Sequence, residues 1–464
     1  MSNDIILPIG LSLDTGDLII DPYPNLSRLV IGSTGAAKTT SVVMPTIQSL
    51  MGNTDVSVCT YDVKDGECYP QIKPVAEKYG RSFGCFDDMA VYGWDNPDRI
   101  ITNPFGCIVS AAKHNPYELI FTIQSATHNI IPEVNDGGRN FYFRESPRQE
   151  IHTGILCLHE FLPNDVRPGM LYEMMSDPEI WYRSRINAVE DGSPELKARA
   201  MLSLDMQENE PEGYYKHLRA ALTPMQIYSP SSSLNQSGVG ETHTHEELCS
   251  DGWLTHFILP QRYAKRVGIH MALHQQCMSE AQLSGRGGRL ISINDEMTNS
   301  PQKSEVELVT IQRSYSKSCI YLAQTFTDIE KQYGEKEAAI LLDNCAVKQY
   351  LSITNYADAE KISKAMGEEI SVSQSMNVNP ERLEISGSIS TGKQPVMTPS
   401  ELMNLDPSLQ VTHMKGFGWF VSRKLFQNQI LPTARYLGSN PMEGDPMAVD
   451  PKIELPVPNM AEAA

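Results

Sequence analysis

Residues 28–40, Arg-Leu-Val-Ile-Gly-Ser-Thr-Gly-Ala-Ala-Lys-Thr-Thr, decide the fold of this chain. The apolar run that ends at Ile31 predicts a buried strand, and the small residues after it predict a tight loop that opens a helix. In such a loop, backbone N–H groups surround phosphate, Lys38 adds a positive charge and the Thr39 hydroxyl ligates magnesium. We therefore expect ATP and magnesium to bind at Gly32, Ser33, Thr34, Gly35, Ala36, Ala37, Lys38, Thr39 and Thr40.

One position departs from the usual phosphate-loop pattern, because Ala37 stands where a glycine normally precedes the lysine. If this residue has right-handed backbone angles, its methyl group costs little. If the loop needs a positive φ there, alanine strains it. The alternative interpretation is a glycine-rich turn that binds no nucleotide.

Short runs rich in valine and isoleucine alternate with helical patterns towards both ends of the chain. This alternation is typical of an α/β fold with a mainly parallel sheet covered on both faces. Predicted strands cover residues 28–32, 56–62, 82–86, 254–259, 290–295, 318–323, 349–354 and 416–421. Predicted helices among them cover residues 39–50, 66–79, 262–282 and 357–366.

The middle of the chain has little strand pattern, and its helical patterns follow one another at 116–126, 144–161, 170–175, 194–206 and 214–225. We therefore expect an all-α domain inserted between two halves of one α/β domain. The predicted boundaries are 1–109 and 251–442 for the two halves of the nucleotide-binding domain and 110–250 for the insertion. Residues 443–464, rich in proline and acidic side chains, are predicted to form a flexible tail.

ATP hydrolysis also needs acidic groups at the end of a neighbouring strand. Residues 290–294 form a strand pattern that closes in Asp295 and Glu296. Asp295 is the predicted magnesium-side acid, together with Thr39, and Glu296 is the predicted base for the attacking water. Gln324 ends the next strand, where it could sense the γ-phosphate. Arg313 could reach a neighbouring subunit's phosphate as an arginine finger, or it could be an exposed arginine at a helix end.

Composition excludes several classes of protein. Lys plus Arg number 38 against 57 Asp plus Glu, so the net charge of −19 argues against a protein that simply coats nucleic acid. No apolar run is long enough to span a membrane, and the N-terminus lacks the pattern of a secretory signal. The nine cysteines include no C-x-x-C pair, which predicts reduced, buried thiols in a cytoplasmic protein.

Three further motifs have both a functional and a structural interpretation. The stretch 62–67, Asp-Val-Lys-Asp-Gly-Glu, follows a predicted strand at the edge where open α/β sheets bind ligands. His243 and His245, with acidic neighbours and Cys249, resemble a metal cluster, but a polar loop and helix start is the favoured interpretation. The aromatic residues 141–143 are more typical of a core or an interface than of a platform for nucleic-acid bases.

Taken in order, these blocks resemble the coupling proteins of type IV secretion and conjugation, the TraG/TraD-like ATPases. The matching blocks are residues 32–39 with Pro45-Thr46, 62–67 with Asp65 inserted, Asn103-Pro104-Phe105, 140–143, Asp295-Glu296, Arg313, Gln324, Tyr333-Gly334, Asn344-Cys345 and 395–402. No single short block is specific, but their shared order covers residues 29 to about 403. The resemblance strengthens the roles expected for Arg313 and Gln324.

The resemblance implies a RecA-like nucleotide-binding domain with an all-α domain, assembled as a homo-hexamer that binds ATP between subunits. It also implies delivery of single-stranded DNA, a relaxase or effector cargo to type IV secretion channel components, at the cytoplasmic face of the inner membrane. Family members usually begin with membrane-spanning helices, which this sequence lacks. Two alternatives stay open: a degenerate P-loop adaptor that recruits cargo without turnover, and a mobile-element DNA-packaging ATPase.

Overall fold

A computed structural model describes residues 5–133, 140–299, 306, 308–379, 384–442, 444 and 452–455. Its centre is an eleven-stranded sheet whose middle strands are parallel. In sheet order these strands are β9 (Val347–Ser352), β3 (Arg28–Gly32), β8 (Lys317–Ala323), β7 (Arg289–Asn294), β4 (Val56–Asp62), β6 (Leu254–Ile258) and β5 (Phe83–Phe86). The predicted α/β class with a mainly parallel sheet is confirmed.

Antiparallel strands extend this sheet beyond β9. They are β12 (Leu409–Met414), β13 (Gly418–Arg423), β1 (Pro8–Leu11) and β2 (Leu18–Ile20). Of these four strands, the sequence indicated only β13, because the others are short or interrupted by polar residues. The N-terminal strand β1 therefore pairs with β13 from the far end of the chain, and β2 pairs with β1 at the edge of the sheet.

Helices cover both faces of the sheet, and strand residues alternate between the two apolar clusters they join. Ile320 and Leu322 of β8 pack with the helices of one face, whereas Cys319 and Tyr321 pack with those of the other. The first face carries η1 (Thr39–Val43), α1 (Met44–Ser49) and α2 (Cys68–Lys78). The second carries α11 (Ala264–Leu283), α13 (Phe326–Tyr333), α14 (Glu335–Asn344) and α15 (Tyr356–Met366).

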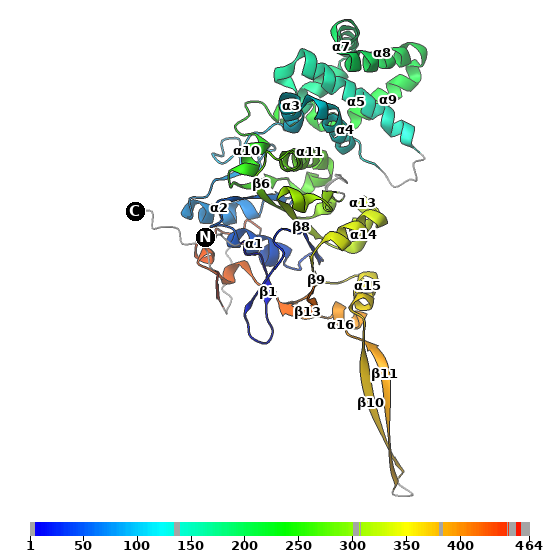
Figure 1. Cartoon of the computed structure of the whole chain (residues 1–464). Coiled ribbons are helices and arrows are strands. Elements are labelled where there is room, and N and C mark those ends of the chain that lie inside the picture. Colours follow the sequence, from blue (N-terminus) through cyan, green and yellow to red (C-terminus); the bar gives the residue numbers. More distant parts are fainter. Residues whose placement is uncertain are drawn as a thin grey trace.

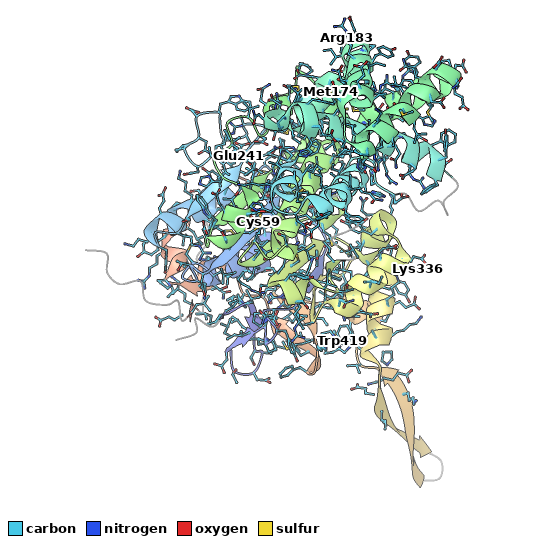
Figure 2. The ribbon with its side chains drawn as sticks, turned by 45° about the horizontal axis from the view of Figure 1, so that its top comes forward. Cys59, Met174, Arg183, Glu241, Lys336 and Trp419 are labelled. Carbon is cyan, nitrogen blue, oxygen red and sulfur yellow. The ribbon has the colours of Figure 1, made fainter. Side chains whose placement is uncertain are left out.

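The middle of the chain forms the inserted helical region, which lies above the sheet in Figure 1. In Figure 2, Met174 and Arg183 mark it, and Trp419 marks the distant part of the sheet. The helices are α3 (Gly106–His114), α4 (Leu119–Ile130), α5 (Phe141–Phe161), α6 (Pro168–Ser176), α7 (Pro178–Asp191), α8 (Pro194–Asn209), α9 (Pro211–Met225) and α10 (His245–Ser250). One continuous apolar cluster joins them to α11 and β4.

A long hairpin leaves the α/β domain on the side away from the helical insertion (Figure 1). Its strands β10 (Glu368–Asn379) and β11 (Glu384–Pro395) pair antiparallel, and α16 (Pro399–Met403) follows. Sequence analysis did not predict it, although Ile370, Val372, Met376 and Val378 alternate with polar residues in the pattern of a strand.

The remaining elements are short. Helical turns are η2 (Pro116–Glu118), η3 (Pro163–Asp165), η4 (Gln226–Tyr228), η5 (Ser233–Gln236), η6 (Gln261–Tyr263), η7 (Met297–Asn299), η8 (Gln312–Tyr315), η9 (Gln427–Gln429) and η10 (Thr433–Tyr436). The strand β15 (Ile453–Glu454) pairs with β14 (Ile430–Leu431). Most of the predicted flexible tail, 443–464, lies outside the described residues.

Two expectations from composition concern thiols and membranes. All nine cysteines are free and buried, as predicted. Among the described residues, no helix combines the length and apolar character that crossing a bilayer requires.

Candidate functional site

The predicted phosphate loop leaves the carboxyl end of β3 and leads into η1. Lys38 is 5 % exposed, and its Nζ donates to the Gly32 carbonyl at 2.6 Å, across the mouth of the loop. The same Nζ lies 3.4 Å from Glu296 Oε1. A buried ammonium in this position is oriented before any phosphate arrives.

Ala37 has a φ of 67°, which lies in the left-handed region. Of the two backbone conformations considered from the sequence, this is the one that strains an alanine. Its carbonyl accepts hydrogen bonds from the Ser41 backbone N–H at 2.8 Å and from Ser41 Oγ at 2.6 Å, which helps hold this geometry. Because Cβ crowds the backbone there, alanine stores strain of about 1–3 kcal/mol. Residue 37 therefore has the backbone conformation that glycine favours, although it is an alanine.

Lys424 forms a hydrogen bond with the phosphate loop, and sequence analysis did not identify this residue. It follows β13, and its Nζ donates to the Ala36 carbonyl at 3.1 Å. Burial lowers the pKa of Lys424 from 10.5 to about 8, although the charge of Asp406 opposes this. The contact joins residues that lie far apart in the sequence, so only the antiparallel end of the sheet reveals it.

The acidic pair at the end of β7 divides between two positions. Glu296 Oε1 faces Lys38 and also accepts a hydrogen bond from Gln324 Nε2 at 3.2 Å. Glu296 has a φ of 52°, so a second non-glycine residue of the site is left-handed. Asp295 points elsewhere, and its Oδ2 lies 3.1 Å from Lys64 Nζ. The structure therefore brings Lys38, Glu296 and Gln324 into one connected group.

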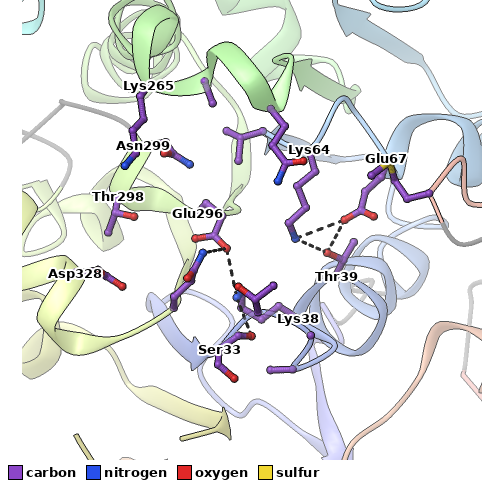
Figure 3. A pocket seen from close by; sticks show the side chains of 18 of the residues that line it. Ser33, Lys38, Thr39, Lys64, Glu67, Lys265, Glu296, Thr298, Asn299 and Asp328 are labelled. Atoms are coloured by element: carbon purple, nitrogen blue, oxygen red, sulfur yellow. Dashed lines mark hydrogen bonds and ion pairs between the residues drawn. The ribbon is translucent and has the colours of Figure 1, made fainter. Parts of the chain in front are cut away.

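Lys64 comes from the 62–67 motif and lies among oxygen atoms suited to a cation. Its Nζ is 3.1 Å from Thr39 Oγ1 and 3.6 Å from Glu67 Oε1 (Figure 3). The same Nζ is 3.1 Å from Asp295 Oδ2. Burial by itself lowers the pKa of Lys64, but the charges of Asp295 and Glu67 outweigh it and raise the pKa above the usual range.

The donor set around Lys64 fits magnesium. A hydroxyl and two carboxylates are oxygen ligands, which Mg²⁺ prefers. Asp295 Oδ1 is buried and has no hydrogen bond among the described residues, so this carboxylate has unused capacity. Thr39 and Asp295, the ligands predicted from sequence, both contact the Lys64 ammonium. Glu67 is a further candidate ligand that sequence analysis did not assign.

A cavity of about 760 Å³ opens above the loop. Residues 33–40 line its floor, and Gln324, Glu296 and Asp328 line one side. Its opposite wall carries Arg262, Lys265 and Arg266 from η6 and the start of α11, and Figure 3 shows Lys265 reaching down towards Asn299. Sequence analysis placed these residues in a helix without a role. Their spacing puts them on one helical face, a signal that could have been noticed.

Other motifs lie away from this cavity. Arg313 is exposed on η8 and does not line it, so its proposed action on a neighbouring subunit stays a prediction. The aromatic residues 141–143 are exposed at the start of α5 rather than in a core. His243 is half-buried beside α10, where Thr244 and Glu247 form a capping box, so the favoured interpretation as a polar loop and helix start fits that part of the motif. His245 is instead buried against His274.

Comparisons with known proteins bear on the family and the fold of this chain. Residues 289–407 match the family model described as the TraM recognition site of TraD and TraG. No curated protein sequence matches the chain.

Solved structures match over nearly the whole chain. Unbound bacterial conjugative coupling protein TrwB superposes with a TM-score of 0.66 at 14% identity, covering 93% of this chain and 92% of that one. TrwB in complex with the non-hydrolysable ATP analogue ADPNP has a TM-score of 0.60 at 14% identity, covering 88% and 87%. TrwB in complex with ADP and Mg²⁺ has a TM-score of 0.60 at 14% identity, covering 90% of each chain. The expected resemblance to coupling proteins is confirmed, in sequence over 289–407 and in fold over most of the chain.

Proposed function

We propose that this chain is an ATPase of a conjugation or type IV secretion apparatus, which uses ATP hydrolysis to deliver single-stranded DNA or protein cargo to a transfer channel. The observation that carries the proposal is the connected group at the cavity floor. Lys38 Nζ lies 3.4 Å from Glu296 Oε1, and the same oxygen accepts from Gln324. A phosphate-binding cation, a carboxylate base and an amide sensor are the parts that phosphoryl transfer to water requires.

Each residue then has a role that its contacts support. Lys38 exchanges its contact with Glu296 for the β- and γ-phosphates, which frees the carboxylate to accept a proton from the attacking water. Gln324 keeps Glu296 oriented and registers the loss of the γ-phosphate. Thr39 and Asp295 hold magnesium, which when bound supplies positive charge to the phosphates.

The cations on the opposite wall complete the charge balance of the site. Arg262, Lys265 and Arg266 face the loop across the cavity. An ATP molecule carries several negative charges, so cations on both sides offset its desolvation. Lys265 and Arg266 also link the ATP site to the all-α insertion, because they lie on α11, which shares the apolar core of that insertion.

Transfer activity is the finer part of the proposal. The matched family model describes a TraM recognition site, which suggests a partner from a conjugation complex at residues 289–407. Arg313 lies in this segment and is exposed, as a residue that reaches into a neighbouring subunit must be. We therefore infer a homo-hexamer in its active form, with relaxase or effector cargo and channel components as partners.

The decisive experiment compares ATP binding with ATP turnover. Glu296→Gln should bind ATP with unchanged affinity, but hydrolyse it at least about 100-fold more slowly, because an amide cannot accept the proton. Glu335→Gln, an exposed change at the start of α14, is the matched control and should keep wild-type turnover. Full turnover in Glu296→Gln would remove the assigned base.

Strain at Ala37 favours one rival, a degenerate P-loop adaptor that recruits cargo without hydrolysis. Steady-state ATPase measurements on the wild-type chain, with and without single-stranded DNA, separate the two. Stimulation by single-stranded DNA supports the transfer motor, and ATP binding without turnover supports the adaptor. Stimulation by duplex DNA alone would instead indicate a packaging motor.

A further inference from the structure

A second cluster of chemically active side chains lies away from the ATP cavity, between the sheet and the helical insertion. Asp88 follows the edge strand β5, and His270 and His274 lie four residues apart on α11, hence on one helical face. All three side chains are buried, with exposed fractions of 6 %, 1 % and 1 %. Neither the phosphate loop nor the proposed hydrolysis uses them.

The three side chains converge on one point. Asp88 Oδ2 lies 3.1 Å from His270 Nε2 and 3.9 Å from His274 Nε2, and one ligand atom from each residue lies within 4.8 Å of the others. Ligands of a tetrahedral zinc ion at bond lengths of about 2.0–2.2 Å are separated by about 3.3–3.5 Å. The observed separations bracket this value, so small side-chain adjustments would suffice.

The outward-facing ring nitrogens are held by neighbours. His270 Nδ1 lies 3.2 Å from Tyr228 Oη. His274 Nδ1 lies 2.9 Å from His245 Nε2 and 3.3 Å from Thr102 Oγ1. In metal sites, a ligating histidine has its second nitrogen oriented in this way, which fixes the ring and its tautomer. Both Nε2 atoms are thereby turned towards Asp88.

One of these nitrogens has no other use. His274 Nε2 is buried and has no hydrogen bond among the described residues. The centroid of the Phe257 ring lies 5.0 Å from the ring centroid of His274 and 5.8 Å from that of His270, so an apolar ring packs against both histidines. A buried polar atom without a partner is costly, and a metal ion at this point would remove the cost.

The competing explanation is a hydrogen-bonded polar cluster without metal. Asp88 already has two other partners, since Arg99 Nη2 lies 3.6 Å from Oδ1 and the Ser237 hydroxyl donates to Oδ2. These contacts satisfy the carboxylate, but they leave His274 Nε2 unpaired.

We propose that Asp88, His270 and His274 bind one zinc ion that fastens the edge strand of the sheet to α11. Imidazole and carboxylate ligands suit zinc among the common divalent metals. The ion would cross-link two elements that the chain connects only through the whole helical insertion. Its position implies a structural role, in which the ion stiffens the contact between the sheet and the helical insertion.

Zinc titration of the full chain, stripped with a chelator, tests the proposal. Competition with a chromophoric chelator should show about one tight equivalent in the wild type. His274→Gln and His270→Gln should each weaken that binding by more than about 100-fold. His243→Ala, at a half-buried histidine of the neighbouring loop, and Asp295→Asn, at the proposed magnesium site, should both keep the full equivalent. Equal zinc binding by wild type and both ligand variants would overturn the site, as would its absence from the wild type.

A second measurement needs no variant and therefore does not depend on mutant folding. Cobalt(II) added to the stripped wild-type chain should give the visible absorption bands of a tetrahedral nitrogen and oxygen site. These bands should disappear when stoichiometric zinc is added. Spectra of octahedral cobalt alone, unaffected by zinc, would refute the proposal.

Discussion

Replacing Ala37 by glycine tests how much strain the phosphate loop stores. A left-handed alanine costs about 1–3 kcal/mol, and glycine removes that cost because it has no Cβ. Against this, glycine gains about 0.5–1 kcal/mol of conformational entropy on unfolding, and the half-buried methyl group contributes a few tenths more. The hydrogen bonds from Ser41 to the residue 37 carbonyl survive, since they involve the backbone. We therefore expect Ala37→Gly to stabilise the nucleotide-binding domain by about 1 kcal/mol.

Urea unfolding of the wild type and the variant measures this difference, with Ala36→Gly as the matched control. Ala36 is buried and does not have a positive φ, so glycine there has only costs and should destabilise by about 1–2 kcal/mol. ATP affinity should not change in Ala37→Gly if the loop keeps its shape on binding, because strain relief then cancels between the free and bound states. Equal destabilisation by both variants would refute the strain at residue 37.

Three further predictions concern Lys38, Arg313 and Lys424. Lys38→Ala should weaken ATP binding by about 10–100-fold in an equilibrium titration while circular dichroism stays unchanged, because one charge-assisted contact is lost. Arg313→Ala should bind ATP normally but hydrolyse it slowly, and mixing it with Lys38→Ala protein should restore part of the turnover; failure of the mixture would return Arg313 to a surface role. For Lys424, the pKa lies near 8 in the folded chain and near 10.5 in the unfolded one. Between these values the unfolded chain binds more protons, so wild-type stability relative to Lys424→Met should rise from about pH 8 to about pH 10. A difference that stays constant over this range would contradict the lowered pKa.

The parallel part of the sheet could be predicted because its strands are buried on both faces. The strand β4 is rich in valine and small side chains and is buried at every position, and the small residues after β3 mark the turn into the next helix. Sequence analysis did not recognise the hairpin β10–β11 or the strand β12. Apolar residues such as Val372 and Val411 do alternate with polar ones there, but these strands are not the continuously buried kind from which the parallel sheet was predicted. The strand β12 pairs with β9 from an earlier part of the chain, whereas β10 and β11 pair with each other as neighbouring segments.

The residues of the phosphate loop and the acidic pair were accessible from the sequence, because parallel strands place their carboxyl ends at one edge. Their partners were not. Lys64 lies between Thr39 and Asp295 only because β4 is next to β7, and Lys424 reaches Ala36 only through the antiparallel extension of the sheet.

The sequence alone therefore determined the fold class and the residue types that contact phosphate, since both depend on local spacing and local burial. The tertiary structure decided the sign of φ at Ala37, the position of the Lys64 ammonium and the convergence of Asp88, His270 and His274. Each of these depends on strand order or on helix packing, which brings together side chains from separate parts of the chain. Local sequence patterns do not specify the distances between these side chains, because strand order and helix packing depend on the whole domain.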